Sequence, residues 1–136
     1  MRYLAIDHGS KRTGLAICDA GEVMVSPLCV LHGQKQVLDK IAQVVVDEEV
    51  DAIVLGLPLN MDGSEGPQAK LVKAFAEQLQ QRVDVPVELH DERLSSFGAR
   101  EKLESMDLSK GKRRGLVDAV AAAEILESFL EQEKGR

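Results

Sequence analysis

The sequence predicts an α/β fold in which a mixed five-stranded sheet carries helices on both faces. Three apolar segments follow one another closely at the N-terminus, and apolar segments then alternate with amphipathic ones. The segment 51–57 is a continuous apolar run, which is typical of a parallel strand covered on both faces. Closely spaced strands pair antiparallel and strands separated by helices pair parallel, so the first three should form an antiparallel meander.

The three strands of this meander are expected at 2–7, 13–19 and 23–31. The polar run 19–22 supplies the turn between the second and the third strand. Pro27 lacks an N–H group and therefore suits a strand at the edge of the sheet.

Helices and strands alternate in the remainder of the chain. The expected elements are a helix at 34–49, a strand at 51–57, a loop at 58–66, a helix that begins near Pro67 and carries its buried stripe to Val83, a strand at 85–91, a helix at 94–105, a polar and mobile segment at 106–114, a helix at 115–132 and a frayed tail at 133–136.

The length of 136 residues predicts a single domain, 1–136. No apolar stretch is long enough to span a membrane, and no secretory signal precedes the first strand. The two cysteines form no metal-type pair, so a cytoplasmic protein is expected. The net charge of −6 argues against binding nucleic acid through bulk electrostatics, although a basic cluster lies at 110–114.

An aspartate ends the first expected strand, and a turn that contains glycine follows it. Asp7 precedes Gly9, and the second strand contains Gly14. Asp and Gly are common in turns, so this pattern is also compatible with a simple hairpin. A carboxylate beside bare backbone can equally be approached by a metal ion or a phosphate.

Two adjacent acids, Asp91 and Glu92, end the last expected strand. Ligands gather at the carboxyl ends of parallel strands, so this pair should lie at the same sheet edge as Asp7. Only one of the two can share a face with Asp7, because side chains alternate along a strand. The sequence leaves open which of them does.

A third acid lies within the apolar stripe of the last expected helix. Asp118 shares its face with Ala122 and Ile125 at about 100° per residue. A charge there is costly unless it is paired. Two interpretations remain open, an ion pair with a nearby base or a cation shared with Asp7. The candidate bases are Arg93, Lys112 and Arg114.

Three acids that converge in a partly dry site repel one another unless a cation neutralises them. Carboxylate oxygens suit Mg²⁺ or Mn²⁺ better than zinc. Two such ions about 3.5–4 Å apart can activate water and stabilise the leaving oxygen of a phosphodiester. This chemistry would also let an acidic protein hold a phosphate backbone at one place.

Four motifs, in order along the chain, resemble the YqgF/RuvX family of bacterial proteins. They are Asp7-His8-Gly9-Ser10-Lys11-Arg12-Thr13-Gly14-Leu15-Ala16, Gly56-Leu57-Pro58-Leu59-Asn60 with Gly63, Asp91-Glu92-Arg93-Leu94-Ser95-Ser96 and Asp118-Ala119-Val120-Ala121-Ala122. The resemblance implies a ribonuclease H-like fold, related to that of Holliday-junction resolvases. It also implies an endonuclease, dependent on Mg²⁺ or Mn²⁺, in 5′-end maturation of pre-16S ribosomal RNA. Asp7, Glu92 and Asp118 would be its catalytic, metal-binding acids, with Asp91 in support.

Seven further residues are expected to contact nucleic acid: Lys11, Arg12, Asn60, Arg93, Lys112, Arg113 and Arg114. Arg12 could instead anchor the hairpin, and Arg93 could hold the carboxylates in place. The chain has no Trp, one Tyr and three Phe, so recognition should rest on shape and backbone rather than on base stacking. His8 and His90 flank the acids and are expected to be structural.

Other functions remain open beside ribosomal RNA processing. The four-acid set of resolvases is only partly reproduced, so resolution of a branched DNA junction is an alternative. A non-catalytic ribosome-assembly or nucleic-acid-binding factor is another, and a nucleotide-binding module of the sugar-kinase type would need a second such domain. The expected protein is a monomer or a weak homodimer.

Overall fold

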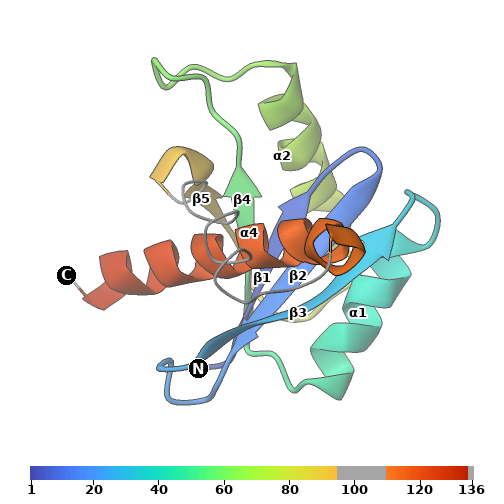
Figure 1. Ribbon diagram of the computed structural model, residues 1–136, viewed down its shortest axis with the longest axis vertical. Helices are drawn as coiled ribbons and strands as arrows, with labels where there is room; N and C mark the ends of the chain where they lie inside the picture. Colours follow the sequence, from blue (N-terminus) through green and yellow to red (C-terminus); the bar gives the residue numbers. More distant parts are fainter. Residues whose placement is uncertain (95–109, 135–136) are drawn as a thin grey trace.

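The computed structural model describes residues 1–94 and 110–134. Five strands form one sheet in the order β3-β2-β1-β4-β5, with β1 at its centre (Figure 1). The strands are β1 (Tyr3–His8), β2 (Arg12–Cys18), β3 (Val25–His32), β4 (Ala52–Leu57) and β5 (Val87–Asp91), and the helices are α1 (Val37–Asp47), α2 (Pro67–Gln80), the 3₁₀ helix η1 (Glu92–Leu94) and α4 (Lys110–Lys134).

The pairing confirms the predicted mixed sheet. β1 pairs antiparallel with β2, and β2 pairs antiparallel with β3. β4 is parallel to both β1 and β5. Pro27 lies on β3 at the edge of the sheet, as its missing N–H group predicts.

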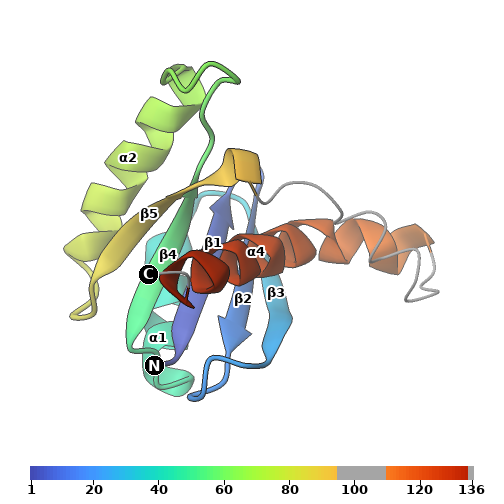
Figure 2. The same cartoon turned by 90° about the vertical axis from the view of Figure 1, so that its left-hand side faces the viewer.

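Helices cover both faces of the sheet, also as predicted. α4 crosses one face, and α1 and α2 pack on the other (Figure 2). Strand alternation sends Ala5 to the α4 face and Leu4 to the opposite face. Each face thereby closes its own hydrophobic core.

Several boundaries differ from the prediction by two or three residues. α1 begins at Val37 rather than at 34, because Gln36 takes a left-handed φ of 63° that a helix cannot include. It ends at Asp47, shortly before Glu49 adopts a φ of 53°. β5 begins at Val87 because Pro86 has no N–H group to donate to the neighbouring strand.

The prediction of a mobile polar segment at 106–114 is wrong for its last five residues. α4 begins at Lys110 and continues to Lys134, so it also includes two residues of the expected tail. Lysine and arginine are good helix formers, and they offset the cost of the glycines in this stretch. The helix expected at 94–105 lies outside the described residues apart from Leu94, which ends η1. Within the described ranges, no helix has both the length and the hydropathy that a bilayer-spanning segment requires.

Candidate active site

Asp7 lies near the end of the central strand, between two glycines of the neighbouring strands. It is paired with Gly14 of β2 in the sheet register. On the other side, Ile6 pairs with Leu55, so Gly56 of β4 follows at the level of Asp7. Asp7 continues the alternation of Tyr3 and Ala5 and therefore belongs to the α4 face. The acid is thus flanked by positions that carry no side chain.

Gly14 permits the backbone of α4 to approach the sheet beside Asp7. A Cβ atom at Gly14 would lie 1.9 Å from the carbonyl oxygen of Asp118 and 2.7 Å from the nitrogen of Ala119. No side chain other than hydrogen fits such a space, because backbone atoms cannot move aside as a flexible side chain can. This contact fixes Asp118 next to Asp7.

Gly56 provides the corresponding space for Glu92. A Cβ atom at Gly56 would lie 3.4 Å from the carboxyl carbon of Glu92 and 2.6 Å from Cδ1 of Ile125. Glu92 begins η1, immediately after β5, and its carboxyl group is hydrogen-bonded to that of Asp7. The structure therefore answers the question that the sequence left open: Glu92, and not Asp91, lies against Asp7.

The electrostatics of Asp7 reflect this crowding. Burial, the hydrogen bond with Glu92 and the negative charges of Glu92 and Asp118 together raise the pKa of Asp7 to about 8. Burial is the largest of these causes. At neutral pH Asp7 therefore holds a proton, which it donates to Glu92.

Asp118 is neutralised differently. The Nε atom of Arg12 lies 2.9 Å from Oδ2 of Asp118, and the Asp118 side chain is 22% exposed. Of the two interpretations of Asp118, an ion pair is present, and its partner is Arg12, a base that was not among the expected candidates. The side chains of two of those candidates, Lys112 and Arg114, lie outside the described part of the structure. The pair does not have hydrogen-bond geometry, and the buried Oδ2 atom accepts no hydrogen bond from any described residue.

Arg93 holds the other acid of the pair. Its guanidinium group donates hydrogen bonds to both carboxylate oxygens of Asp91, at 2.7–3.1 Å, and to the carbonyl oxygen of Met61 at 3.1 Å. The hydrogen bonds from Arg93 hold the pKa of Asp91 below its usual range. Arg93 therefore links the end of β5 to the loop that follows β4, in line with the expectation that it holds a carboxylate in place.

The loop at 58–66 is folded on itself. The side-chain amide of Asn60 donates to Oγ of Ser64 at 3.0 Å. The backbone carbonyl oxygen of Asn60 accepts from the N–H of Gly63, which has a φ of 88°. Asp62 accepts hydrogen bonds from both the backbone and the hydroxyl of Ser64. Asn60 is exposed at the surface of this loop, beside β4 and not within the acidic cluster.

Both histidines have structural environments, as expected. His8 lies on the face opposite the acids, where its ring stacks on Phe75 at 3.8 Å and contacts the Thr13 hydroxyl at 3.1 Å. His90 is buried and contacts the hydroxyl of Ser128 at 2.9 Å. Burial lowers the pKa of each ring.

The remaining sequence-predicted residues belong to the β1–β2 turn and to the start of α4. Lys11 is exposed in the β1–β2 turn, next to Arg12. Lys112, Arg113 and Arg114 lie in the first turns of α4, the helix that carries Asp118. The structure therefore brings Asp7, Glu92, Asp118 and Arg12 together.

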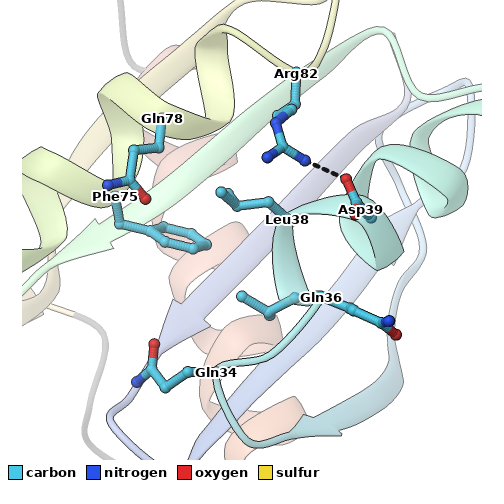
Figure 3. Close-up of a pocket in the computed structure, with 8 residues that line it drawn as sticks. Gln34, Gln36, Leu38, Asp39, Phe75, Gln78 and Arg82 are labelled. Carbon is cyan, nitrogen blue, oxygen red and sulfur yellow. Dashed lines mark hydrogen bonds and ion pairs between the residues drawn. The ribbon is translucent and has the colours of Figure 1, made fainter.

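A cavity of about 190 Å³ opens on the opposite face, between α1 and α2 (Figure 3). Gln34, Phe75 and Gln78 line one part of it, and the ion pair between Arg82 and Asp39 closes another. This cavity shares no residue with the acidic cluster.

The types of ligand atom in the acidic cluster suit a hard divalent cation such as Mg²⁺. All of its donors are carboxylate oxygens, and one of them, Oδ2 of Asp118, is buried without a hydrogen bond from the described residues. Over those same residues, no three His, Cys, Asp or Glu side chains are already arranged to enclose a metal ion. The ion pair with Arg12 and the proton on Asp7 occupy the ligand oxygens in the present arrangement.

Comparison with known proteins places this site in context. The sequence model of the RuvX family, described as a Holliday junction resolvase, matches residues 1–132. A relative from Anaeromyxobacter dehalogenans, named "Putative pre-16S rRNA nuclease", is 46% identical over 136 residues, which cover 97% of this chain and 98% of the relative.

Solved structures show the same fold at low sequence identity. The Thermus thermophilus RuvC in complex with a Holliday junction matches with a TM-score of 0.61 and 15% identity, over 98% of this chain and 96% of the other. The fowlpox virus resolvase bound to junction DNA matches with a TM-score of 0.61 and 13% identity, over 98% and 99%. The ribonuclease H-like fold expected from the resemblance is therefore confirmed.

Proposed function

The chain belongs to the RuvX family, and from that premise we propose that it is a metal-dependent endonuclease that cleaves pre-16S ribosomal RNA during maturation of its 5′ end. The convergence of Asp7, Glu92 and Asp118 at one edge of the sheet supports this function. The proposed substrate is taken from the names of relatives that match nearly the whole chain.

In this proposal the three acids hold Mg²⁺ or Mn²⁺. A divalent cation at such a site supplies an activated water and stabilises the leaving oxygen of the phosphodiester. The chain contributes the position of the ligands: Gly14 and Gly56 leave the space in which Asp118 and Glu92 reach Asp7. A cation bound there would favour the ionised form of Asp7, because its positive charge would offset the burial and the neighbouring negative charges that raise the pKa of Asp7.

Basic and polar residues around the cluster are proposed to hold the sugar–phosphate backbone. Lys11 lies in the β1–β2 turn, Arg12 begins β2, and Asn60 lies in the loop that Arg93 links to the end of β5. Lys112, Arg113 and Arg114 belong to the first turns of α4 and are proposed to add to these contacts. Contacts of this kind orient a nucleic acid without reading its bases. A single cytoplasmic domain that acts as a monomer or a weak homodimer is consistent with this arrangement.

Resolution of Holliday junctions is the second candidate. The description of the matching family favours it, and the fold is that of resolvases bound to junction DNA. The two candidates share the site and differ in the shape of the substrate, so a substrate comparison separates them.

The test is cleavage of a labelled pre-16S RNA fragment and of a four-way DNA junction, each with Mg²⁺ or Mn²⁺. Wild type should cut the RNA, and Asp118→Asn should lower the rate by more than about 100-fold, because a ligand is lost. Glu131→Gln is the matched control, since it neutralises an exposed acid on the same helix. Preferential cutting of the junction would favour the resolvase, and an undiminished rate in Asp118→Asn would exclude the proposed site.

Absence of cleavage of either substrate, by protein shown to be folded and to bind Mn²⁺, would favour the non-catalytic assembly factor. Retention of RNA binding in Asp118→Asn would then support that alternative.

A further inference from the structure

Arg12 is a cation that the described structure places directly on the acidic cluster. Its guanidinium group lies on Asp118, next to the hydrogen bond between the carboxyl groups of Asp7 and Glu92. The function proposed above gives no role to this ion pair. The geometry of the ion pair indicates one.

The contact between Arg12 and Asp118 is short, but it lacks hydrogen-bond geometry. The Nε atom of Arg12 lies 2.9 Å from Oδ2, yet this oxygen accepts no hydrogen bond from the described residues. The Arg12 side chain is 53% exposed, so water competes with the carboxylate for its N–H groups. Ion pairs of this exposure contribute little to stability. Such a weak ion pair can be displaced by a divalent cation that binds Asp118 more tightly than the guanidinium group does.

Only the side chain of Arg12 would have to move. Its carbonyl oxygen accepts a hydrogen bond of 2.9 Å from the N–H of Gly9, which closes the β1–β2 turn. Lys11, its neighbour, accepts a hydrogen bond of 2.7 Å from the N–H of Gly33. The backbone at Lys11 and Arg12 is therefore anchored to the β1–β2 turn and to the residue that follows β3, while the Arg12 side chain is exposed to solvent.

The oxygen that Arg12 contacts is also the buried acceptor that best fits a metal ion. A divalent cation and a guanidinium group cannot both neutralise Oδ2 of Asp118, because they repel each other at contact distance. We propose that Arg12 stands in for the metal ion on Asp118 and that metal binding displaces it toward solvent, where it contacts a phosphate of the substrate. This inference rests on the proposed function, because it presupposes a metal ion at the acidic cluster.

The first test is Mn²⁺ affinity, measured by electron paramagnetic resonance without nucleic acid. Arg12→Gln removes the competitor and should bind Mn²⁺ about threefold to tenfold more tightly than wild type. Lys11→Gln removes the same charge from the adjacent exposed residue and should leave the affinity within about twofold of wild type, because the ion pair that the described residues form with Asp118 comes from Arg12 and not from Lys11.

Equal affinities in wild type and Arg12→Gln would overturn the inference and leave the nuclease proposal intact. An equal gain in Lys11→Gln would also overturn it, because the effect would then be a general one of net charge. Absence of Mn²⁺ binding in every variant would overturn the proposed function together with the inference.

The second test observes Arg12 itself. The Nε–H resonance of Arg12 should shift toward that of a solvent-exposed guanidinium group as Mg²⁺ is added to the wild-type protein, and Asp118→Asn should show that position from the outset. If the Arg12 resonance does not change at saturating Mg²⁺, the proposed displacement of Arg12 from Asp118 is wrong.

The third test concerns the phosphate contact. The measured quantity is the slope of the logarithm of RNA affinity against the logarithm of salt concentration. With Ca²⁺ present, this slope should be steeper in wild type than in Arg12→Gln by about one unit. With EDTA, the slopes of the two proteins should be equal. Ca²⁺ is chosen to limit cleavage during the measurement. A difference of the same size in EDTA would show that Arg12 contacts RNA without release from Asp118, and would overturn the inference.

Discussion

The two faces of the sheet are made by the same strands but differ in the size of their side chains. The face under α1 and α2 is lined by large residues, and the face under α4 is lined largely by alanine and glycine near the acids. The large residues are Leu4, Ile6, Leu15, Ile53 and Leu55, and the small ones are Ala5, Gly14, Ala16, Ala52 and Gly56.

This difference separates two tasks. Large side chains keep a helix at a distance and bury much apolar area, which stabilises the fold. Small ones let the backbone of α4 touch β2 at Gly14, so that Asp118 reaches Asp7. The face under α1 and α2 therefore contributes to the stability of the fold. The face under α4 buries smaller side chains near the acids, and this leaves space for the polar site.

The largest expected effect comes from Gly14→Ala. Its Cβ would lie 1.9 Å from the carbonyl oxygen of Asp118, so α4 must shift. We expect a loss of about 3–5 kcal/mol in the free energy of unfolding. Mn²⁺ affinity should fall more than about tenfold at temperatures where the variant is folded, because the acids no longer converge. Urea unfolding and Mn²⁺ titration measure the two effects.

Leu15→Ala is the matched variant on the opposite face of the same strand. Leu15 is fully buried, and its truncation should cost about 2–5 kcal/mol. Mn²⁺ affinity should stay within about twofold of wild type, because the contact between α4 and Gly14 is unchanged. If both variants lose Mn²⁺ affinity equally, the two faces do not have separate tasks.

Asp7→Asn should have a smaller effect on the free energy of unfolding, and it should stabilise the protein rather than destabilise it. The pKa of Asp7 is raised to about 8, so between about pH 4 and pH 8 the folded state holds a proton that the unfolded state has lost. Wild-type stability therefore falls as the pH rises through this window. In EDTA, the variant should be more stable at pH 8 by about 1–3 kcal/mol, a rise in Tm of about 3–10 °C.

The control for this prediction is Asp91→Asn. The pKa of Asp91 is lowered by Arg93, so its ionised form stabilises the fold and the variant should lose stability at pH 8. A decrease in Tm in Asp7→Asn as well would mean that Asp7 is stabilised by its neighbours rather than repelled by them.

The smallest effect is expected for His8→Gln. His8 adjoins Asp7 in sequence but stacks on Phe75 at the opposite face. The variant should lose about 0.5–1.5 kcal/mol of stability and keep the pH dependence of cleavage. Removal of a general acid or base would instead cost about 100-fold or more in rate. A changed pH–rate profile would show that the histidine reaches the site from the other face.

Strand patterns were enough to predict most of the fold and the position of Asp7 near the end of a strand. Alternation and apolar runs gave the meander, the two parallel strands and the position of Asp7 at a strand end, because these depend on local periodicity. The helical spacing around Asp118 predicted the face on which it lies, and the structure places that face on the sheet.

Long-range contacts account for what the sequence did not reveal. The choice of Glu92 over Asp91 depends on the turn into η1, and the ion pair between Arg12 and Asp118 joins residues from distant parts of the chain. α4 begins earlier than predicted, at Lys110, because the lysine and arginine residues between the glycines at 111 and 115 favour a helix. A glycine inside a strand, opposite an acid, was the available signal for the close approach of α4.

Asp7 and Asp118 belong to the first strand and the last helix, so the acidic cluster depends on the two ends of the chain meeting. During synthesis, β1, β2 and β3 leave the ribosome first and can pair through local contacts, whereas α4 arrives last. A nascent chain that already contains most of the sheet therefore lacks Asp118 against Gly14. If the acids hold the proposed metal ion, this capacity would appear only after α4 has packed on β2, and Mn²⁺ binding would report that packing.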